Sequence, residues 1–347
     1  MLVDSPPEQR AETAPAPPTR RAIRTVGLLV SVVILVLVAL ASIAIGAKEL
    51  PLDQVWHGLF HDSGTYADVV VGERRSRTVL GLLVGAALGL SGAVLQALTR
   101  NPLADPGLLG INAGASAAAV TAITYFGVTT LSGYVWFAFF GAAAVGALVW
   151  FLGGSRGATP VRLALAGTAI SAALYGYLQA VMIMDDAALG KMRFWTVGSL
   201  ASATDSMIMQ VLPFLVIGSV LALTLARPLN AMAMGDDTAR ALGANLNRTR
   251  ALSMAAATVL CGAATAACGP IVFVGLMVPH VVRSFTGPDL RWILPYATVL
   301  SPVLLLGADV VGRIVARPAE LQVGIVTAVI GGPVFIYLVR RRRTAQL

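Results

Sequence analysis

Ionisable side chains are scarce in the apolar stretches of this 347-residue chain, so the few that occur there are the first candidates for chemistry. Asp309 lies deep in an apolar run, and Arg313 follows it four residues later. An acid placed four residues before a base favours an ion pair on one face of a helix. We therefore expect a structural pair between Asp309 and Arg313, because a proton relay would show more ionisable residues at membrane depth.

Metal, redox and covalent chemistry have no matching pattern of residues. His57 and His61 lie in a polar connection, and His280 has no second ligand near it in the sequence. Cys261 and Cys268 lie inside one apolar run, which is typical of small buried side chains rather than of a disulfide or a metal pair. We expect no catalytic residues, no metal and no cofactor.

Nucleotide binding by the usual phosphate loop is also excluded. The chain has no G-x-x-x-x-G-K-[ST] motif, and its lysines are Lys48 and Lys191. Any work driven by ATP therefore requires a separate partner chain.

Composition places the chain in a membrane. Hydrophobic residues make up 57% and charged residues only 12%, and the mean hydropathy is +0.79; a soluble protein has about 25% charged residues. The net charge of +8 resides mainly in short connections between apolar runs, where it orients a membrane protein rather than binding nucleic acid. Apolar runs near the roughly 20 residues of a spanning helix are too long for barrel strands.

The sequence predicts an all-α integral membrane protein with about ten transmembrane helices in one domain, residues 25–343. Most arginines lie on the side that would hold both termini, so both termini are expected in the cytoplasm. Residues 1–24 contain five prolines and no apolar core, which predicts a disordered cytoplasmic leader. The apolar runs lie at residues 25–46, 78–98, 108–126, 133–152, 161–184, 206–226, 251–268, 271–286, 293–316 and 323–339.

The second run is the most informative stretch, because its small residues recur at every fourth position. A stripe of this kind lets another backbone approach closely and predicts a helix-packing face. Residues 99–107 then contain two prolines and a glycine, which predict a break before the next helix. The stripe consists of Gly81, Gly85, Gly89, Ala93 and Ala97.

Small residues also recur on the fifth predicted helix, where two interpretations remain open. Gly167 and Ser171 are four residues apart, as are Ala172 and Gly176. Such residues pack tightly against a neighbour or line the wall of a wide path. After this helix, residues 185–205 are expected outside the membrane, with the aromatic pair Phe194 and Trp195 along the outer surface.

The longest cytoplasmic connection, residues 227–250, is suited to docking on another protein. Asp236 and Asp237 can start a short helix and Gly243 can end it. A loop that only covers the helix ends is the alternative. The apolar side chains offered for docking are Leu229, Met232, Met234, Leu242 and Leu246.

Several segments together closely resemble one family of membrane transporters. They span residues 70–343 in order and resemble the FecCD family, permeases that import ferric siderophores, haem and cobalamin with an ATP-binding cassette (ABC) partner. Residues 1–24 lie outside the resemblance. The matching segments are residues 74–111, 235–243, 269–283, 294–295, 308–313, 320–328 and 331–335.

The resemblance implies the type II ABC importer permease fold and a set of partners. A second permease subunit, identical or paralogous, would share a central path, with two ABC ATPase subunits beneath it. An extracytoplasmic substrate-binding protein would deliver the metal complex.

The resemblance also implies roles for individual residues. Asn101 and Leu103 match the cytoplasmic gate loop, and the segment Thr159-Pro160-Val161 departs from the small hydroxyl residues that the cobalamin importer has at its gate. The expected path-lining residues are Gly167, Ser171, Ala172 and Gly176. The residues that match the ATPase-coupling helices are Gly235, Asp236, Asp237, Ala239, Arg240, Leu242 and Gly243. The arginines that match those receiving the binding protein are Arg74, Arg77 and Arg313.

We therefore expect a non-catalytic permease subunit of the cell membrane that translocates a ferric siderophore, with haem or cobalamin as the alternative cargo. A proton-coupled secondary transporter is the contrasting class, and it would need a midplane carboxylate or histidine among broken helices. Membrane lipid is the remaining expected partner, and nucleic acid is not expected.

Overall fold

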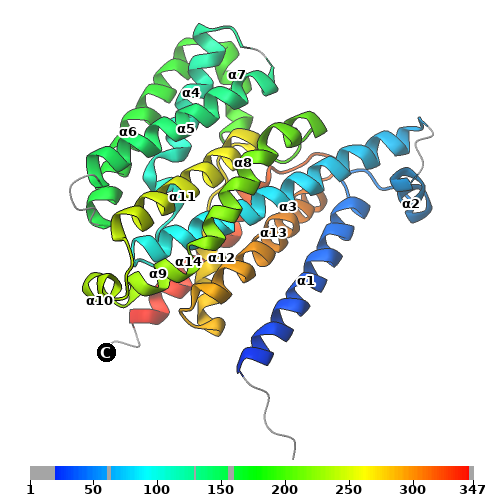
Figure 1. Cartoon of the computed structure of the whole chain (residues 1–347). Helices are drawn as coiled ribbons and strands as arrows, with labels where there is room; N and C mark the ends of the chain where they lie inside the picture. The colour runs from blue at the N-terminus through cyan, green and yellow to red at the C-terminus, as the bar shows by residue number, and fades with distance from the viewer. Residues whose placement is uncertain (1–19, 61–63, 129, 155–159, 344–347) are drawn as a thin grey trace, which may run out of the picture.

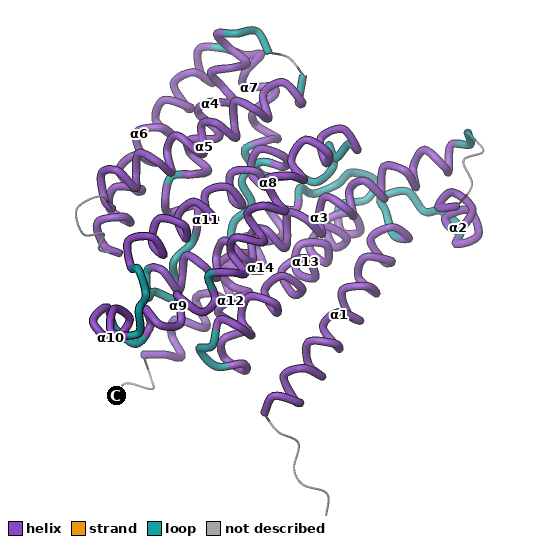
Figure 2. Tube along the Cα trace, viewed as in Figure 1, coloured by secondary structure: helices purple, strands orange, loops and turns teal. Residues whose placement is uncertain are grey.

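A computed structural model of the chain describes residues 20–60, 64–128, 130–154 and 160–343, and these residues form helices and loops without strands (Figure 2). Ten helices correspond one to one to the ten apolar runs. They are α1 (Arg20–Ala44), α3 (Tyr66–Leu98), α4 (Ile111–Tyr125), α5 (Leu131–Gly154), α6 (Pro160–Met184), α8 (Asp205–Thr224), α11 (Leu246–Cys268), α12 (Val274–Thr286), α13 (Leu290–Val315) and α14 (Val323–Arg343).

Seven of these helices are long and apolar enough to cross a membrane, namely α1, α3, α5, α6, α8, α11 and α13. The other three are α4 and α12, with 15 and 13 residues, and α14, whose apolar part is Val323–Tyr337. This agrees with the expectation of about ten membrane helices. The first helix begins at Arg20, within the expected leader, and residues 1–19 lie outside the described residues.

Short helices join the long ones. The connections contain α2 (Leu52–Phe60), a 3-10 turn η1 (Pro106–Leu109), α7 (Asp186–Trp195), α9 (Ala226–Ala233) and α10 (Asp236–Ala241). The first turn of α1, the last turns of α14, and α9 and α10 all lie at one end of the bundle, whereas α2 and α7 lie at the other (Figure 1).

Helix α3 forms the centre of the bundle. Thr65 caps its first turn: the Thr65 Oγ1 accepts from the Asp68 amide (3.3 Å), and the Asp68 Oδ2 accepts from the Thr65 amide (2.9 Å). The helix has 33 residues, and 78% of its most apolar 18-residue stretch is buried within the chain. Gly85 and Gly89 of the predicted packing face lie against Pro302 and Ser301 of α13, so this face packs on a neighbouring helix. Gly92, which is outside the predicted stripe, lies against Gly275 of α12.

The connection between α11 and α12 is unwound rather than a simple bend. Gly269 and Phe273 both have left-handed φ values, of 75° and 69°, so α12 begins at Val274, three residues later than expected. The segment that precedes α8 enters this break through Gly198 and Ser199. The Ser199 amide donates to the Cys268 carbonyl (2.7 Å), and the Gly324 amide donates to the Gly198 carbonyl (3.1 Å).

The expectation that residues 185–205 lie along the outer surface is therefore only partly met. Phe194 is 51% exposed, as expected of an interfacial aromatic, but Trp195 is 7% exposed and Leu200 is fully buried. Residues 195–200 are inserted among helix ends because their backbone groups complete those of the broken helices.

Candidate functional site

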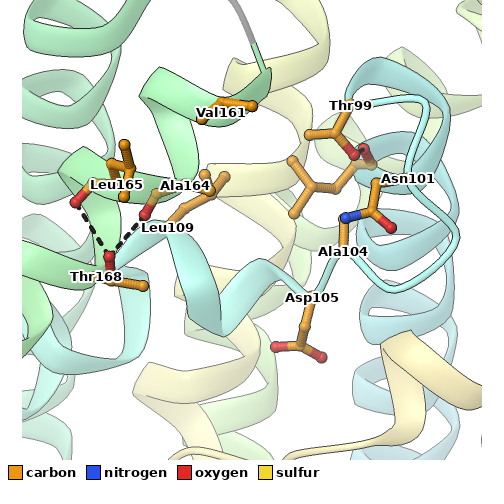
Figure 3. Close-up of a pocket in the computed structure, with 10 residues that line it drawn as sticks. Thr99, Asn101, Ala104, Asp105, Leu109, Val161, Ala164, Leu165 and Thr168 are labelled. Atoms are coloured by element: carbon orange, nitrogen blue, oxygen red, sulfur yellow. Dashed lines mark hydrogen bonds between the residues drawn. The ribbon is translucent and has the colours of Figure 1, made fainter.

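A cavity of about 390 Å³ separates the break after α3 from the first half of α6. Figure 3 shows the two walls facing each other, with Asn101 on one side and Val161 on the other. The lining is largely apolar and is open at one side. Its residues are Leu95, Thr99, Asn101, Ala104, Asp105, Leu109, Val161, Ala164, Leu165 and Thr168.

The break is a compact turn held by its own polar groups. The Asn101 amide donates back to the Gln96 carbonyl (3.1 Å), and the Asn101 Oδ1 accepts from the Leu103 amide (2.9 Å). The Asp105 Oδ1 accepts from the Gly107 amide (2.7 Å) and so caps η1. Burial raises the pKa of the Asp105 carboxyl to about 6, against the opposing effect of the Gly107 hydrogen bond.

The two predicted gate residues point to different places. Asn101 is exposed and lines the cavity, whereas Leu103 lies with Leu276 and Met277 of α12 beside a second, much smaller cavity. The structure therefore brings Asn101 to α6 but not Leu103. In the segment that departs from the cobalamin importer, Val161 lines the cavity wall and Thr159 lies outside the described residues.

The four predicted path-lining residues lie on two faces of α6. Gly167 and Ser171 face the turn at Gly110: a Cβ added to Gly110 would lie 3.3 Å from the Gly167 carbonyl oxygen and 3.2 Å from the Ser171 Oγ. Ala172 is exposed, and a Cβ added to Gly176 would have no neighbour within 4 Å. The face with Gly167 and Ser171 therefore packs against the same chain, whereas the face with Ala172 and Gly176 is left open.

The segment expected to couple to an ATPase consists of α9 and α10. Leu229 and Met232 of α9 are 0% and 2% exposed, and Leu246 is also buried, so these three side chains are not available for docking. Met234 and Leu242 are 59% and 63% exposed. Only these two of the five proposed apolar contacts face outward.

Helix α10 is bounded as expected and carries two kinds of charge. Gly235 and Gly243 have left-handed φ values of 109° and 81°, which glycine adopts without strain. The Arg240 Nη1 donates to the Asp237 Oδ1 (2.7 Å) in an exposed pair within the helix. Asp236 instead accepts from two arginines outside the helix, and Ala239 is fully buried.

The partners of Asp236 come from distant parts of the chain. The Arg250 Nη2, on α11, donates to the Asp236 Oδ2 (2.6 Å), and the Arg100 Nη2, in the break after α3, donates to the Asp236 Oδ1. Burial opposes ionisation of Asp236, but the two arginines outweigh it and lower the pKa of this carboxyl. No local spacing in the sequence indicates this cluster.

At the opposite end of the bundle, Asp309 binds two arginines. The expected partner is present, with the Arg313 Nη2 at 2.9 Å from the Asp309 Oδ2. The Arg77 Nη2 also donates to the Asp309 Oδ1 (2.7 Å), and the Arg77 Nη1 donates to the Glu320 Oε2 (2.6 Å). Sequence spacing could indicate the first pair but not the contacts with Arg77, which is on α3.

Arg74 and Arg313 bind the C-terminal end of α1. The Arg74 guanidinium donates to the carbonyls of Ile43, Ala44 and Lys48. The Arg313 guanidinium donates to the carbonyls of Ser42 and Ile45, both at 2.9 Å. These bonds satisfy carbonyls that the end of a helix leaves without partners.

The three predicted docking arginines are thus mainly internal. Arg74, Arg77 and Arg313 are 6%, 8% and 1% exposed. They line a polar outer cavity of about 200 Å³, together with the exposed side chains of Lys48 and Glu73.

Comparison with known proteins shows the family. The model of the FecCD transport family matches residues 34–341. The ferric enterobactin transport system permease protein FepD of Escherichia coli is 45% identical over 326 residues, which cover 93% of this chain and 96% of that protein. The hemin transport system permease protein HmuU of Yersinia pestis is 36% identical, covering 90% of this chain and 94% of that protein.

A solved structure shares the fold. The inward-facing conformation of an ABC transporter assigned to the metal-chelate type superposes with a TM-score of 0.80 and 28% sequence identity, covering 91% of this chain and 99% of the other. The break after α3, the exposed face of α6 and the α9 to α10 segment therefore belong to a permease, the transport component that leaves ATP hydrolysis to a separate subunit. The chain is a multi-pass membrane protein and belongs to the FecCD transport family.

Proposed function

We propose that this permease subunit carries a ferric siderophore complex across the cell membrane, along a path past Asn101 and the exposed face of α6. The observation that carries the proposal is the cavity of about 390 Å³ between that face and the break after α3. Only 17% of the most apolar 18-residue stretch of α6 is buried within the chain. A large exposed apolar surface supports a partner, and a second permease subunit, identical or paralogous, would complete the path.

The relatives support an iron complex as cargo. Besides the ferric enterobactin protein, the Fe(3+)-citrate import system permease protein YfmD of Bacillus subtilis is 37% identical and covers 94% of this chain. Haem and cobalamin are the alternative cargoes, since a hemin permease and a cobalamin import system permease also match.

Uptake assays decide the cargo. A strain lacking this chain should lose uptake of radiolabelled iron supplied as one siderophore class, and plasmid-borne wild-type chain should restore it. Ferric enterobactin, ferric citrate, a ferric hydroxamate, haemin and cobalamin are tested in parallel. Loss confined to haemin or cobalamin would replace the siderophore by that cargo, whereas unchanged uptake of all five would contradict the proposal.

The class of transporter is tested in proteoliposomes. An ABC permease requires its ATPase partner, so uptake should stop when that partner is omitted. Uptake by the chain alone under a pH gradient would instead support a proton-coupled transporter.

We further propose that each of the two ATPase subunits docks on α10 of one permease subunit through the exposed Leu242. Leu242→Asp would place a charge in a contact that excludes water, so the ATPase should no longer copurify. Leu52→Asp is the matched control, because Leu52 on α2 is 75% exposed at the other end of the bundle. Copurification of the ATPase with the Leu242→Asp chain at wild-type levels would remove this assignment.

The orientation follows from the same segment. If α10 docks on a cytoplasmic ATPase, the start of α1 and the end of α14 are cytoplasmic as well, because they lie at the same end of the bundle (Figure 1). We propose that residues 25–343 form one transmembrane domain in this orientation.

An outer substrate-binding protein would then dock at the other end, where the arginine-lined cavity opens. Arg77 and Arg313 are buried, so replacing them would change the stability of the fold and would not report on docking alone. The informative variant is Lys48→Glu, since Lys48 is exposed at the same cavity. Affinity for the binding protein should fall and lose part of its salt dependence. Unchanged affinity at low salt would move docking away from this cavity.

A further inference from the structure

Arg100 joins the break after α3 to the coupling segment. Its Nη2 atom donates to the Met232 carbonyl oxygen (2.6 Å) and to the Asp236 Oδ1. Met232 lies in the last turn of α9 and Asp236 begins α10, and they lie 132 and 136 residues away from Arg100 in the sequence. The guanidinium therefore contacts both helices of the coupling segment at the point where they meet.

The backbone at Arg100 is held in an uncommon conformation. Its φ of 49° lies in the left-handed region, which an arginine adopts only when its surroundings impose it. The residue follows Thr99, the C-cap of α3, and precedes Asn101 at the cavity wall. Because Arg100 directly precedes Asn101, a displacement of the Arg100 side chain also displaces the backbone of Asn101.

Arg250 fixes the other side of the same carboxylate. Its Nη2 donates to the Asp236 Oδ2 (2.6 Å), and its side chain is 17% exposed, compared with 43% for Arg100. One carboxylate thereby connects three segments: the break after α3, the start of α10 and the first turn of α11. Charge-assisted bonds of this kind are short and directional, so they transmit a movement better than an apolar contact does.

We propose that Arg100 is a positioning residue that transmits the movement of α10 to the gate at Asn101. This proposal rests on the proposed function, in which an ATPase moves α10. The turn that carries Asn101 is stiff, because the Asn101 amide donates to the Gln96 carbonyl and the Asn101 Oδ1 accepts from the Leu103 amide. A pull on Arg100 therefore moves Asn101 relative to α6 instead of being absorbed by the loop.

The test uses the full complex of this chain with its ATPase and binding protein in proteoliposomes. Its readouts are copurification of the ATPase, the rate of ATP hydrolysis, and the number of ferric siderophore molecules imported per ATP. Arg100→Gln keeps hydrogen-bonding capacity but removes the charge, and Arg100→Lys keeps the charge. Arg291→Gln is the matched control, because the 64% exposed side chain of Arg291 pairs with Asp289 at the start of α13, outside the coupling segment.

Arg100→Gln should lower import per ATP by roughly fivefold or more, the usual range of coupling between two sites, while the ATPase stays bound and active. Arg100→Lys should restore most of the loss, and Asp236→Asn should reproduce it. Arg291→Gln should match the wild type in all three readouts.

Two results would overturn the proposal. Import per ATP at the wild-type level in Arg100→Gln would show that the link carries no coupling. Loss of the ATPase from the Arg100→Gln complex, or failure of Arg100→Lys to rescue, would show a structural role in holding α9 and α10. Failure of the proposed function is distinguishable, because the wild-type complex itself would then import no ferric siderophore.

Discussion

Helices α3 and α6 both carry small residues at every fourth position, yet they occupy opposite environments. In α3, 78% of the most apolar 18-residue stretch is buried within the chain, whereas in α6 only 17% of the corresponding stretch is buried. A Cβ added to Gly85 of α3 would lie 2.6 Å from the Pro302 Cα, and one added to Gly89 would lie 2.6 Å from the Ala297 carbonyl oxygen. A Cβ added to Gly176 of α6 would meet nothing within 4 Å.

The difference shows what a stripe of small residues can and cannot indicate. It marks a helix face that something approaches closely, but that neighbour can be another helix of the same chain, a second subunit or the cargo. In α3 the neighbour is α13 of the same chain. In α6 the face with Gly167 and Ser171 packs internally, and the face with Ala172 and Gly176 is left open.

The largest effect is expected where α3 buries charge against α13. Asp309→Asn would remove the acid paired with the buried Arg313 and one of the two acids paired with the buried Arg77, which would keep Glu320; breaking a buried pair costs ~3–5 kcal/mol. Thermal unfolding in detergent should show a large loss of stability. Asp237→Asn, which removes the exposed acid paired with Arg240, is the control and should unfold as the wild type does. Equal stability of the two variants would mean that the ion pairs of Asp309 with Arg77 and Arg313 do not stabilise the packing of α3 against α13.

The next effect concerns the glycine stripe. Gly85→Leu would force a side chain into the backbone of Pro302, and overpacking costs ~1–3 kcal/mol or more. Gly72→Leu is the matched control on the same helix, because a Cβ at Gly72 has no neighbour within 4 Å. The midpoint of thermal unfolding should fall for Gly85→Leu alone. A similar fall for both would mean that the contact with Pro302 does not explain the loss; helix propensity would not explain it either, because leucine favours a helix more than glycine does.

On α6 the same substitution should separate transport from stability. Gly176→Leu adds its side chain to an open face, so the unfolding free energy should change by no more than about 0.5 kcal/mol, as at other surface sites. Uptake of the ferric siderophore should nevertheless fall severalfold, because the side chain would narrow the path or disturb the second subunit. Loss of stability like that of Gly85→Leu would erase the contrast between the two helices.

The smallest effect is expected at Asp105, on the break between the packed and the open region. Its folded pKa of about 6 lies above the ordinary value, so the folded state binds the proton more tightly than the unfolded state does. The free energy of unfolding should therefore fall as the pH rises from about 4 to about 6 and level off above that range. Asp105→Asn keeps an oxygen that can cap η1 but does not titrate.

The measurement compares wild type and Asp105→Asn by thermal unfolding across this pH range. The difference between their unfolding midpoints should change with pH only while Asp105 titrates. A constant difference would mean that Asp105 is hydrated at the cavity wall and titrates normally.

Local sequence patterns were sufficient for most of the helices but not for their termini. Proline and glycine at residues 99–107 predicted the break after α3, and the structure shows it. The amphipathic α2 was missed, since its nine residues are too short to stand out from a polar connection. The predicted start of α12 was wrong because Gly269 and Phe273 adopt left-handed conformations next to the inserted residues 195–200.

The sequence by itself determined the class of protein, the positions of about ten membrane helices and the Asp309 and Arg313 pair. Hydropathy and spacings of four residues are local properties, so they can be evaluated without knowing the neighbours. Only the tertiary structure decided that Arg77 reaches Asp309, 232 residues away, that Arg100 reaches Asp236, and which face of α6 is open. These outcomes depend on which helices pack together, because a side chain's partner is set by the distance in space between helices and not by their separation along the chain.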